Sequence, residues 1–106
     1  MQFRGGMNEL MRQAARMQRK IEQTKDQLKD TEVTSSSVGD KVKATVTYGR
    51  KVVRIEIDPE FLASEGADMA LDGACAAINA ALEQADKAME AELEKITGGV
   101  KLPGLV

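Results

Sequence analysis

Apolar and polar residues alternate between Val33 and Ile57, and Gly39-Asp40 and Gly49-Arg50 interrupt the runs rich in Val, Ile and Thr. A period of two predicts β-strands with one apolar face. A glycine at the first central position suits a type II′ hairpin turn. The pattern therefore predicts a three-stranded antiparallel meander with a two-residue loop at each glycine pair.

These two turns fix the cross-strand pairs and place the apolar residues on one face of the sheet. The predicted pairs are Val33 with Val46, Ser35 with Ala44 and Ser37 with Val42 in the first hairpin, and Val46 with Val53, Ala44 with Ile55 and Val42 with Ile57 in the second. The other face is polar except at Val52, and it pairs Lys43 with Glu56 and Lys41 with Asp58. The apolar face needs a cover from another part of the chain.

Residues 6–30 carry apolar side chains at alternating steps of three and four, which predicts an amphipathic helix. This seam consists of Met7, Leu10, Ala14, Met17, Ile21, Thr24 and Leu28. It can pack on the sheet or on the other helix of the same chain. Because a helix of about 24 residues is roughly 36 Å long and such strands span only about 20 Å, part of the seam is expected to pair with a second subunit.

After the last strand, Asp58 and Pro59 suit a helix cap and a first helical position, so a short turn through Leu62 is predicted, with a break over 63–66. A second long helix is predicted over 67–97, stopped by Gly98-Gly99 in the left-handed conformation. Gly73 inside it costs about 1 kcal/mol relative to alanine, which indicates close approach by another backbone. The predicted apolar stripe consists of Leu71, Cys75, Ile78, Leu82, Ala85, Met89, Leu93 and Ile96.

The pattern thus predicts one α+β domain over 1–106, in the order helix, three-stranded meander, helix (α-β-β-β-α), with 1–5 and 100–106 as flexible tails. Two Phe and one Tyr in 106 residues imply a thin aliphatic core. A single cysteine, Cys75, excludes an internal disulfide and, on the apolar stripe, is expected to pack rather than react. No signal peptide or membrane-length apolar run is present, so we expect a cytoplasmic protein without membrane contact.

The chain lacks the residues that several kinds of catalysis and metal binding require. The chain has no histidine, which excludes histidine-based acid–base catalysis and histidine metal sites, and one cysteine cannot form a cysteine-rich zinc site. Gly5-Gly6 precedes a helix but follows no strand, so it is a weak phosphate-loop signal. We therefore expect no enzyme activity, no cofactor, no metal and no small-molecule substrate.

The net charge of −2 is distributed unevenly. Residues 1–20 carry five basic side chains against Glu9 alone, whereas residues 60–106 carry three lysines against nine acids. Arg12, Arg16 and Arg19, spaced four and three apart, form a stripe opposite the seam. A solvated face is the common explanation for such a stripe. Two details favour a polyanion site: only Glu9 and Glu22 can pair with these arginines along the helix, and guanidinium forks suit phosphate.

Four segments in order, MNELMRQAARMQRKIEQTKDQL, VVRIEIDPEFL, LDGACAAINAAL and GGVKLPG, make the chain similar to the YbaB/EbfC family of bacterial nucleoid-associated proteins over nearly its whole length. The most specific matches are Met11, Gln13, Ala14, Met17, Gln18, Lys20, Ile57-Asp58-Pro59, Asn79 and Leu102-Pro103-Gly104. The resemblance implies a homodimer with helices projecting like tweezers, which binds DNA with low or variable sequence preference. The acidic second helix departs from the family pattern and predicts weaker DNA binding, or binding by the first helix alone.

Two functions remain open at this point. The first is a nucleoid-associated homodimer that contacts the phosphates of double-stranded DNA, with other nucleoid proteins as further partners. The second is a protein–protein interaction module that uses its long amphipathic, methionine-containing helices and binds little or no DNA. Lys41, Lys43 and Arg54 are weaker DNA contacts, because Asp58 and Glu56 can neutralise them. The candidate DNA-contacting residues are Arg4, Arg12, Arg16, Arg19, Lys20, Arg50 and Lys51.

Overall fold

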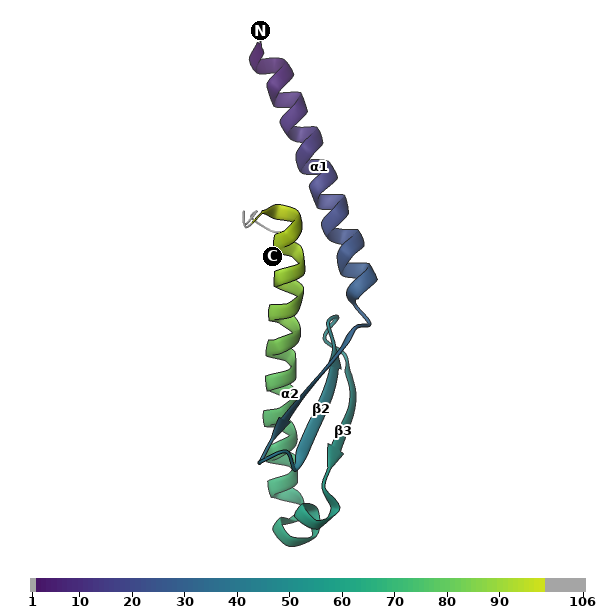
Figure 1. Cartoon of the computed structure of the whole chain (residues 1–106), viewed down its shortest axis with the longest axis vertical. Helices are drawn as coiled ribbons and strands as arrows, with labels where there is room; N and C mark the ends of the chain where they lie inside the picture. Colours follow the sequence, from purple (N-terminus) through teal and green to yellow (C-terminus); the bar gives the residue numbers. More distant parts are fainter. Residues whose placement is uncertain (1, 99–106) are drawn as a thin grey trace.

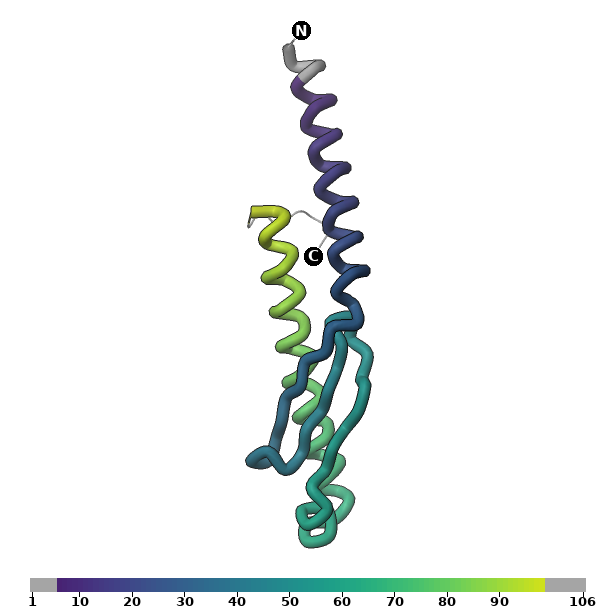
Figure 2. The backbone as a smooth tube through the Cα atoms, turned by 45° about the vertical axis from the view of Figure 1, so that its right-hand side comes forward, coloured from purple at the N-terminus to yellow at the C-terminus, as the bar shows by residue number. Residues whose placement is uncertain are grey.

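The computed structural model describes the backbone of residues 2–98 and the side chains of residues 6–98. The elements are α1 (Gln2–Leu28), β1 (Glu32–Ser37), β2 (Val42–Thr47), β3 (Val52–Ile57) and α2 (Pro59–Thr97). The predicted order of helix, three strands and helix is confirmed, although α1 begins at Gln2 rather than near Gly6. The molecule is a rod of 75 × 19 × 17 Å. The two helices run in opposite directions, and the N-terminal part of α1 extends beyond the end of α2 (Figures 1 and 2).

The first hairpin has the predicted register, with Val33 opposite Val46, Ser35 opposite Ala44 and Ser37 opposite Val42. Its turn differs in type. Gly39 and Asp40 both have positive φ (58° and 68°), and the Lys41 N–H donates to the Val38 carbonyl at 3.1 Å. Positive φ at both central residues defines a type I′ turn rather than the predicted II′. Both types twist with the strands, so the register is unaffected.

The second hairpin differs in loop length. The Arg50 N–H donates to the Thr47 carbonyl at 2.9 Å, and Arg50 has φ 71°, so the loop has three residues and ends in the left-handed region. Ala44 faces Ile55 and Val42 faces Ile57 as predicted, but a bulge pairs Val46 with Val52. The predicted Val46–Val53 pair is therefore wrong. The bulge brings Val52 to the face of Val46, which removes the one apolar exception on the polar face.

The reason for the longer loop lies outside the strands. The N–H groups of Tyr48 and Gly49 donate to the carbonyls of Thr31 (2.8 Å) and Lys29 (2.9 Å), in the segment between α1 and β1. A Cβ on Gly49 would lie 3.0 Å from the Lys29 carbonyl oxygen. The loop is thus shaped by backbone contact with the end of α1, which the strand pattern does not report.

The inner face of the sheet is covered by α2, mainly over β1 and β2 (Figure 1). Val42, Ala44 and Val46 are buried on the sheet side. The helix contributes its small residues, and its buried positions are Ala70, Gly73, Ala74, Ala77, Ala81 and Ala85. The predicted apolar stripe is correct only in part. Ala85 is fully buried, and Ile78 and Leu82 pack against the core, but Leu71 is 61% exposed and Cys75 is exposed, so Cys75 does not pack in the core. Small side chains occupy the contact face because they let the helix axis approach the sheet closely.

Gly73 marks the closest approach. A Cβ there would lie 3.0 Å from Val42 Cγ2 and 3.2 Å from Val38 Cγ2. The Ser37 hydroxyl also donates to the Gly73 carbonyl at 2.7 Å. The predicted close approach is confirmed, but the neighbours are side chains of the first hairpin rather than another backbone.

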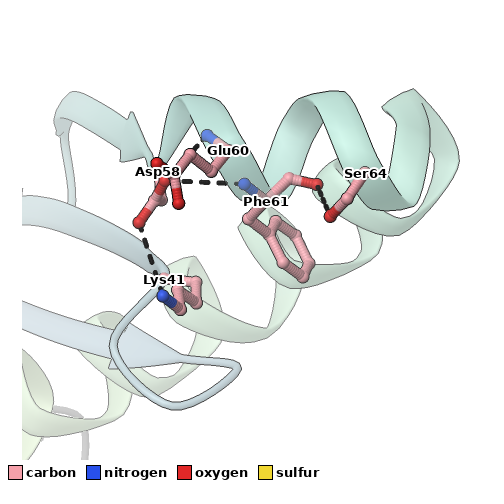
Figure 3. Close-up of polar contacts among 5 residues, drawn as sticks. All are labelled: Lys41, Asp58, Glu60, Phe61 and Ser64. Carbon is pink, nitrogen blue, oxygen red and sulfur yellow. Dashed lines mark hydrogen bonds and ion pairs between the residues drawn. The ribbon is translucent and has the colours of Figure 1, made fainter.

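The cap and the C-terminal stop of α2 are as predicted, but the helix is longer than predicted: it runs from Pro59 to Thr97, and the predicted break over 63–66 is limited to Gly66. Asp58 caps it, with a carboxylate oxygen accepting the N–H groups of Glu60 (2.8 Å) and Phe61 (3.5 Å) (Figure 3), and Pro59 occupies the first helical position. Within α2, the break lies at Gly66 (φ 87°). Gly98 adopts φ 65° and donates its N–H to the Glu94 carbonyl at 2.8 Å. Gly99, the C-terminal tail and the side chains of residues 1–5 lie outside the described part of the chain.

The apolar seam of α1 divides into two halves. Ile21 is 3% exposed, and Met17, Thr24 and Leu28 are half-buried. Among the described elements α1 contacts α2 and none of the three strands, so the alternative in which the seam packs on the sheet is wrong. Further toward the N-terminus, Met7, Leu10 and Ala14 of the seam are exposed. The described part of the chain therefore leaves the N-terminal half of the seam exposed, and the pairing of this half with a second subunit stays a prediction.

Candidate nucleic-acid interface

Arg12, Arg16 and Arg19 lie on the exposed side of α1, opposite the buried Ile21. Arg12 Nη1 is 3.9 Å from one oxygen of Glu9, and Arg16 Nη2 is 3.4 Å from the other. The two arginine side chains are 73% and 62% exposed. Exposed pairs of this kind contribute at most about 1 kcal/mol. Glu9 therefore holds this arginine row (Arg12, Arg16, Arg19) only loosely, and among the described side chains no ion-pair partner of the row comes from α2.

Two neighbouring cations extend the row. Arg19 and Lys20 are exposed, and neither forms an ion pair with any residue whose side chain the structure describes. Arg4 lies within α1, but its side chain is outside the described set. Arg19 and Lys20 thus present positive charge to solvent.

The second group of candidates lies at the tip of the β2–β3 hairpin. Arg50 forms an ion pair with Asp86 of α2, a partner 36 positions away in sequence that helical and strand spacing cannot reveal. Lys51 is exposed and has no ion pair within residues 6–98. The structure places the tip beside the C-terminal end of α1, near Lys25 and Lys29, so Arg50 and Lys51 form a group separate from the arginine row.

The weaker candidates are neutralised largely as predicted. Lys41 Nζ lies 3.5 Å from Asp58 Oδ2 (Figure 3). Arg54 pairs with Glu56 (3.1 Å) and Glu32 (3.7 Å). Lys43 faces Glu56 across the sheet, yet the Glu56 carboxylate accepts from Arg54 and not from Lys43. The outer face of the sheet is therefore a mixed ionic surface rather than a basic one.

An open groove of about 720 Å³ runs between α1, the hairpin tip and α2. Its acidic and basic side chains alternate, and the hydrogen bond from Lys29 to Asp26 (2.9 Å) raises the pKa of Lys29. A groove with this charge balance does not favour a polyanion. It is lined by Glu22, Lys25, Asp26, Lys29, Tyr48, Gly49, Arg50, Asp86, Met89, Glu90 and Leu93.

The described residues contain no group of three or more His, Cys, Asp or Glu side chains placed to hold a metal ion. Of the described helices, none has the length and apolar character needed to span a bilayer. The exposed basic side of α1 is thus the strongest charged feature from which to argue function.

Comparison with known proteins supports a specific class. Residues 3–100 match the model of the YbaB/EbfC DNA-binding family. The chain is 36% identical over 99 residues to a nucleoid-associated protein of Alkaliphilus metalliredigens, covering 93% of this chain and 87% of that protein. It is 38% identical over 104 residues to a nucleoid-associated protein of Acetivibrio thermocellus, covering 97% and 92%.

The fold is shared with a solved structure. The uncharacterized protein HP0035 from Helicobacter pylori superposes with a TM-score of 0.68 over 86% of this chain and 96% of that chain, at 20% identity. At that identity the likeness concerns the fold alone. The family match covers nearly the whole chain, and the chain belongs to the YbaB/EbfC DNA-binding family.

Proposed function

We propose that this protein is a nucleoid-associated, homodimeric DNA-binding protein that holds double-stranded DNA mainly through phosphates. Membership of a DNA-binding family supports the class of partner, and the names of the relatives support the nucleoid as the site of action. The single observation that carries the mode of binding is the arginine row on the exposed side of α1.

The chemistry of the row fits phosphate. Three guanidinium groups on one side of α1 span roughly 10 Å along the axis at 1.5 Å per residue. Guanidinium forks bind phosphate oxygens through paired N–H donors. Contacts of this kind position a protein on DNA without distinguishing bases, so the proposal includes low sequence preference. Arg4, Lys20 and Lys51 are proposed as additional phosphate contacts, and Arg50 as a contact that must share its charge with Asp86.

A dimer would present two copies of the row. The six arginines of the two rows are expected to contribute about −5 to the slope of log affinity against log salt concentration, and the other proposed contacts add to it. The test is a salt titration of binding to random-sequence duplex, comparing the wild type with the variant Arg12→Ala, Arg16→Ala, Arg19→Ala. We expect the variant to bind more weakly and to flatten the slope by about five.

A variant of equal charge change serves as the control. Lys29, Lys87 and Lys95 are exposed, and they pair with Asp26, Glu83 and Glu92 respectively. Replacing these three with alanine removes the same charge but leaves the row intact, so the wild-type slope should persist. Equal losses in both variants would attribute binding to net charge, and unchanged binding in the arginine variant would refute the proposal.

One observation favours a second function. Met7, Leu10 and Met11 near the N-terminus of α1 are 63%, 63% and 67% exposed. Exposed apolar side chains of this size suit a protein–protein contact, including one with another nucleoid protein. If micromolar protein in low salt fails to retard random duplex in a gel, the interaction module becomes the better account.

A further inference from the structure

The groove between α1, the hairpin tip and α2 is amphipathic. It has a volume of about 720 Å³, and most of its exposed lining is apolar. Tyr48, Met89 and Leu93 line it and are half-buried, so each of them keeps part of its surface open to the groove. A site that combines aromatic and aliphatic surface with charged side chains suits a short peptide segment.

The charged side chains of the groove carry one negative charge in excess, because four acidic residues and three basic residues line it. Two of the basic residues are already engaged inside the groove, since Lys29 pairs with Asp26 and Arg50 pairs with Asp86. The segment that best complements this lining therefore carries one basic side chain and no acidic one. The charged lining residues are Glu22, Lys25, Asp26, Lys29, Arg50, Asp86 and Glu90.

The segment that follows α2 has this composition. Residues 99–106, GVKLPGLV, are here called the tail segment, and they contain one lysine and no acidic residue. Pro103 fixes its own φ and restricts Leu102 to extended conformations, so less conformational entropy is lost when the segment binds in an extended form. The aliphatic side chains that it can bring to the groove are those of Val100, Leu102, Leu105 and Val106.

The end of α2 brings the tail segment within reach of the groove. Leu93 lies five residues before Gly98, roughly 8 Å along the helix axis, and Met89 lies roughly 14 Å from it at 1.5 Å per residue. Eight extended residues span up to about 26 Å. Gly98 adopts the left-handed conformation, so the chain beyond it does not continue along the helix axis. The end of α2 also lies alongside α1, as Figures 1 and 2 show.

We propose that the tail segment docks in the groove of its own chain, with its aliphatic side chains on Tyr48, Met89 and Leu93 and with Lys101 beside the acidic lining. The proposal goes beyond DNA binding and depends on neither DNA nor dimerisation. Because the segment is joined directly to α2, its effective concentration at the groove is of millimolar order, which favours it over free peptides of similar sequence. Docked there, it connects the end of α2 to α1 and fixes the separation of the two helices.

Cross-linking from the tail segment to α1 tests the location. In a Cys75→Ser background, Val106→Cys is combined with Lys25→Cys, which lies in the groove, and treated with a short bifunctional maleimide. The matched control combines Val106→Cys with Gln27→Cys, because Gln27 is exposed and lies about 200° around α1 from Lys25. We expect the groove pair to cross-link within one chain roughly tenfold faster than the control pair.

The products of that reaction decide between the alternatives, because mass spectrometry separates links within one chain from links between chains. Equal rates for the Lys25→Cys and Gln27→Cys pairs would refute docking in the groove. A link that forms only between two chains would overturn the assignment of the groove to the tail segment of the same chain.

Tyrosine fluorescence provides a second measurement without cross-linking. Tyr48 is the only tyrosine and the chain has no tryptophan, so its emission reports on the groove. Leu102→Asp makes docking on an apolar surface unfavourable and should raise the acrylamide quenching constant roughly twofold, with circular dichroism unchanged. Gln84→Asp adds the same charge at an exposed position of α2 outside the groove and should leave the constant unchanged. No rise in Leu102→Asp, or an equal rise in both variants, would overturn the proposal.

Discussion

Replacing Gly73 with alanine tests how closely α2 lies against the sheet. The added Cβ would be 3.0 Å from Val42 Cγ2, 3.2 Å from Val38 Cγ2 and 3.5 Å from the Ser37 hydroxyl. The first two separations are shorter than ordinary van der Waals contact. The helix or the two valines must therefore move, and Val42 is fully buried between sheet and helix.

Two opposing contributions decide whether Gly73→Ala raises or lowers the free energy of unfolding. Alanine in a helix interior is favoured over glycine by about 1 kcal/mol. Overpacking a tight contact costs about 1–3 kcal/mol, and weakening the hydrogen bond from Ser37 to the Gly73 carbonyl costs about 1 kcal/mol more. We expect Gly73→Ala to lower the free energy of unfolding by about 1–3 kcal/mol, which lowers the midpoint temperature by roughly 4–8 °C per kcal/mol in a domain of this size.

The assay is urea unfolding followed by circular dichroism at one fixed protein concentration, because dimerisation would make the midpoint depend on concentration. Gly6→Ala is the matched control: Gly6 lies in α1 with no heavy atom within 4 Å of an added Cβ, so it should be neutral or stabilising. In a Val42→Ala background the cost of Gly73→Ala should shrink by about 0.5 kcal/mol or more. Stabilisation by Gly73→Ala equal to that of Gly6→Ala would refute the close contact.

Three further outcomes are expected. The N–H of Glu60 donates to the Asp58 carboxylate and holds the pKa of Asp58 below its ordinary value. The ionised carboxylate therefore stabilises α2 at pH values above the ordinary pKa, and this stabilisation is lost as the pH falls through the lowered pKa. The stability advantage of wild type over Asp58→Asn, measured from urea midpoints, should shrink below about pH 4. Glu9→Gln should tighten DNA binding roughly threefold to tenfold at low salt by freeing the arginine row, whereas Glu22→Gln should not. Ile21→Ala removes about 2–5 kcal/mol of packing and should speed hydrogen exchange in α1 but not in β2.

The element order and the first hairpin could be predicted because they depend on local signals. Period-two alternation and a glycine turn fix the pairs from Val33 to Val42 without reference to the rest of the chain. The cap at Asp58 and the stop at Gly98 are local in the same sense. The second hairpin was mispredicted at Val53 because its loop is held by carbonyls at the end of α1, a contact that no periodicity in the strands encodes.

The buried face of α2 is predicted only in part, for a different reason: Ala85, Ile78 and Leu82 contact the core, but Leu71 and Cys75 do not. Helical periodicity gives weight to large apolar side chains, and Leu71 and Cys75 dominate that pattern. The sheet instead selects the side on which Gly73, Ala77 and Ala81 allow the shortest distance between backbone and sheet. For the site, helical spacing located the arginine row and its acidic neighbour Glu9, whereas the partner of Arg50 depends on tertiary placement.

Charge and packing on α2 together restrict where a polyanion can approach. One face of this helix lies on the sheet, and the adjoining flank carries Leu71 and Ile78. Most of the remaining surface is acidic, and its few cations are engaged, as Lys87 and Lys95 pair with Glu83 and Glu92 of the same helix. DNA is therefore repelled along α2. The exposed positive charge of Arg19 and Lys20 lies on α1. The proposed contact therefore depends on the separation between α1 and the acidic helix, and Ile21 is the most deeply buried residue of α1 among those described.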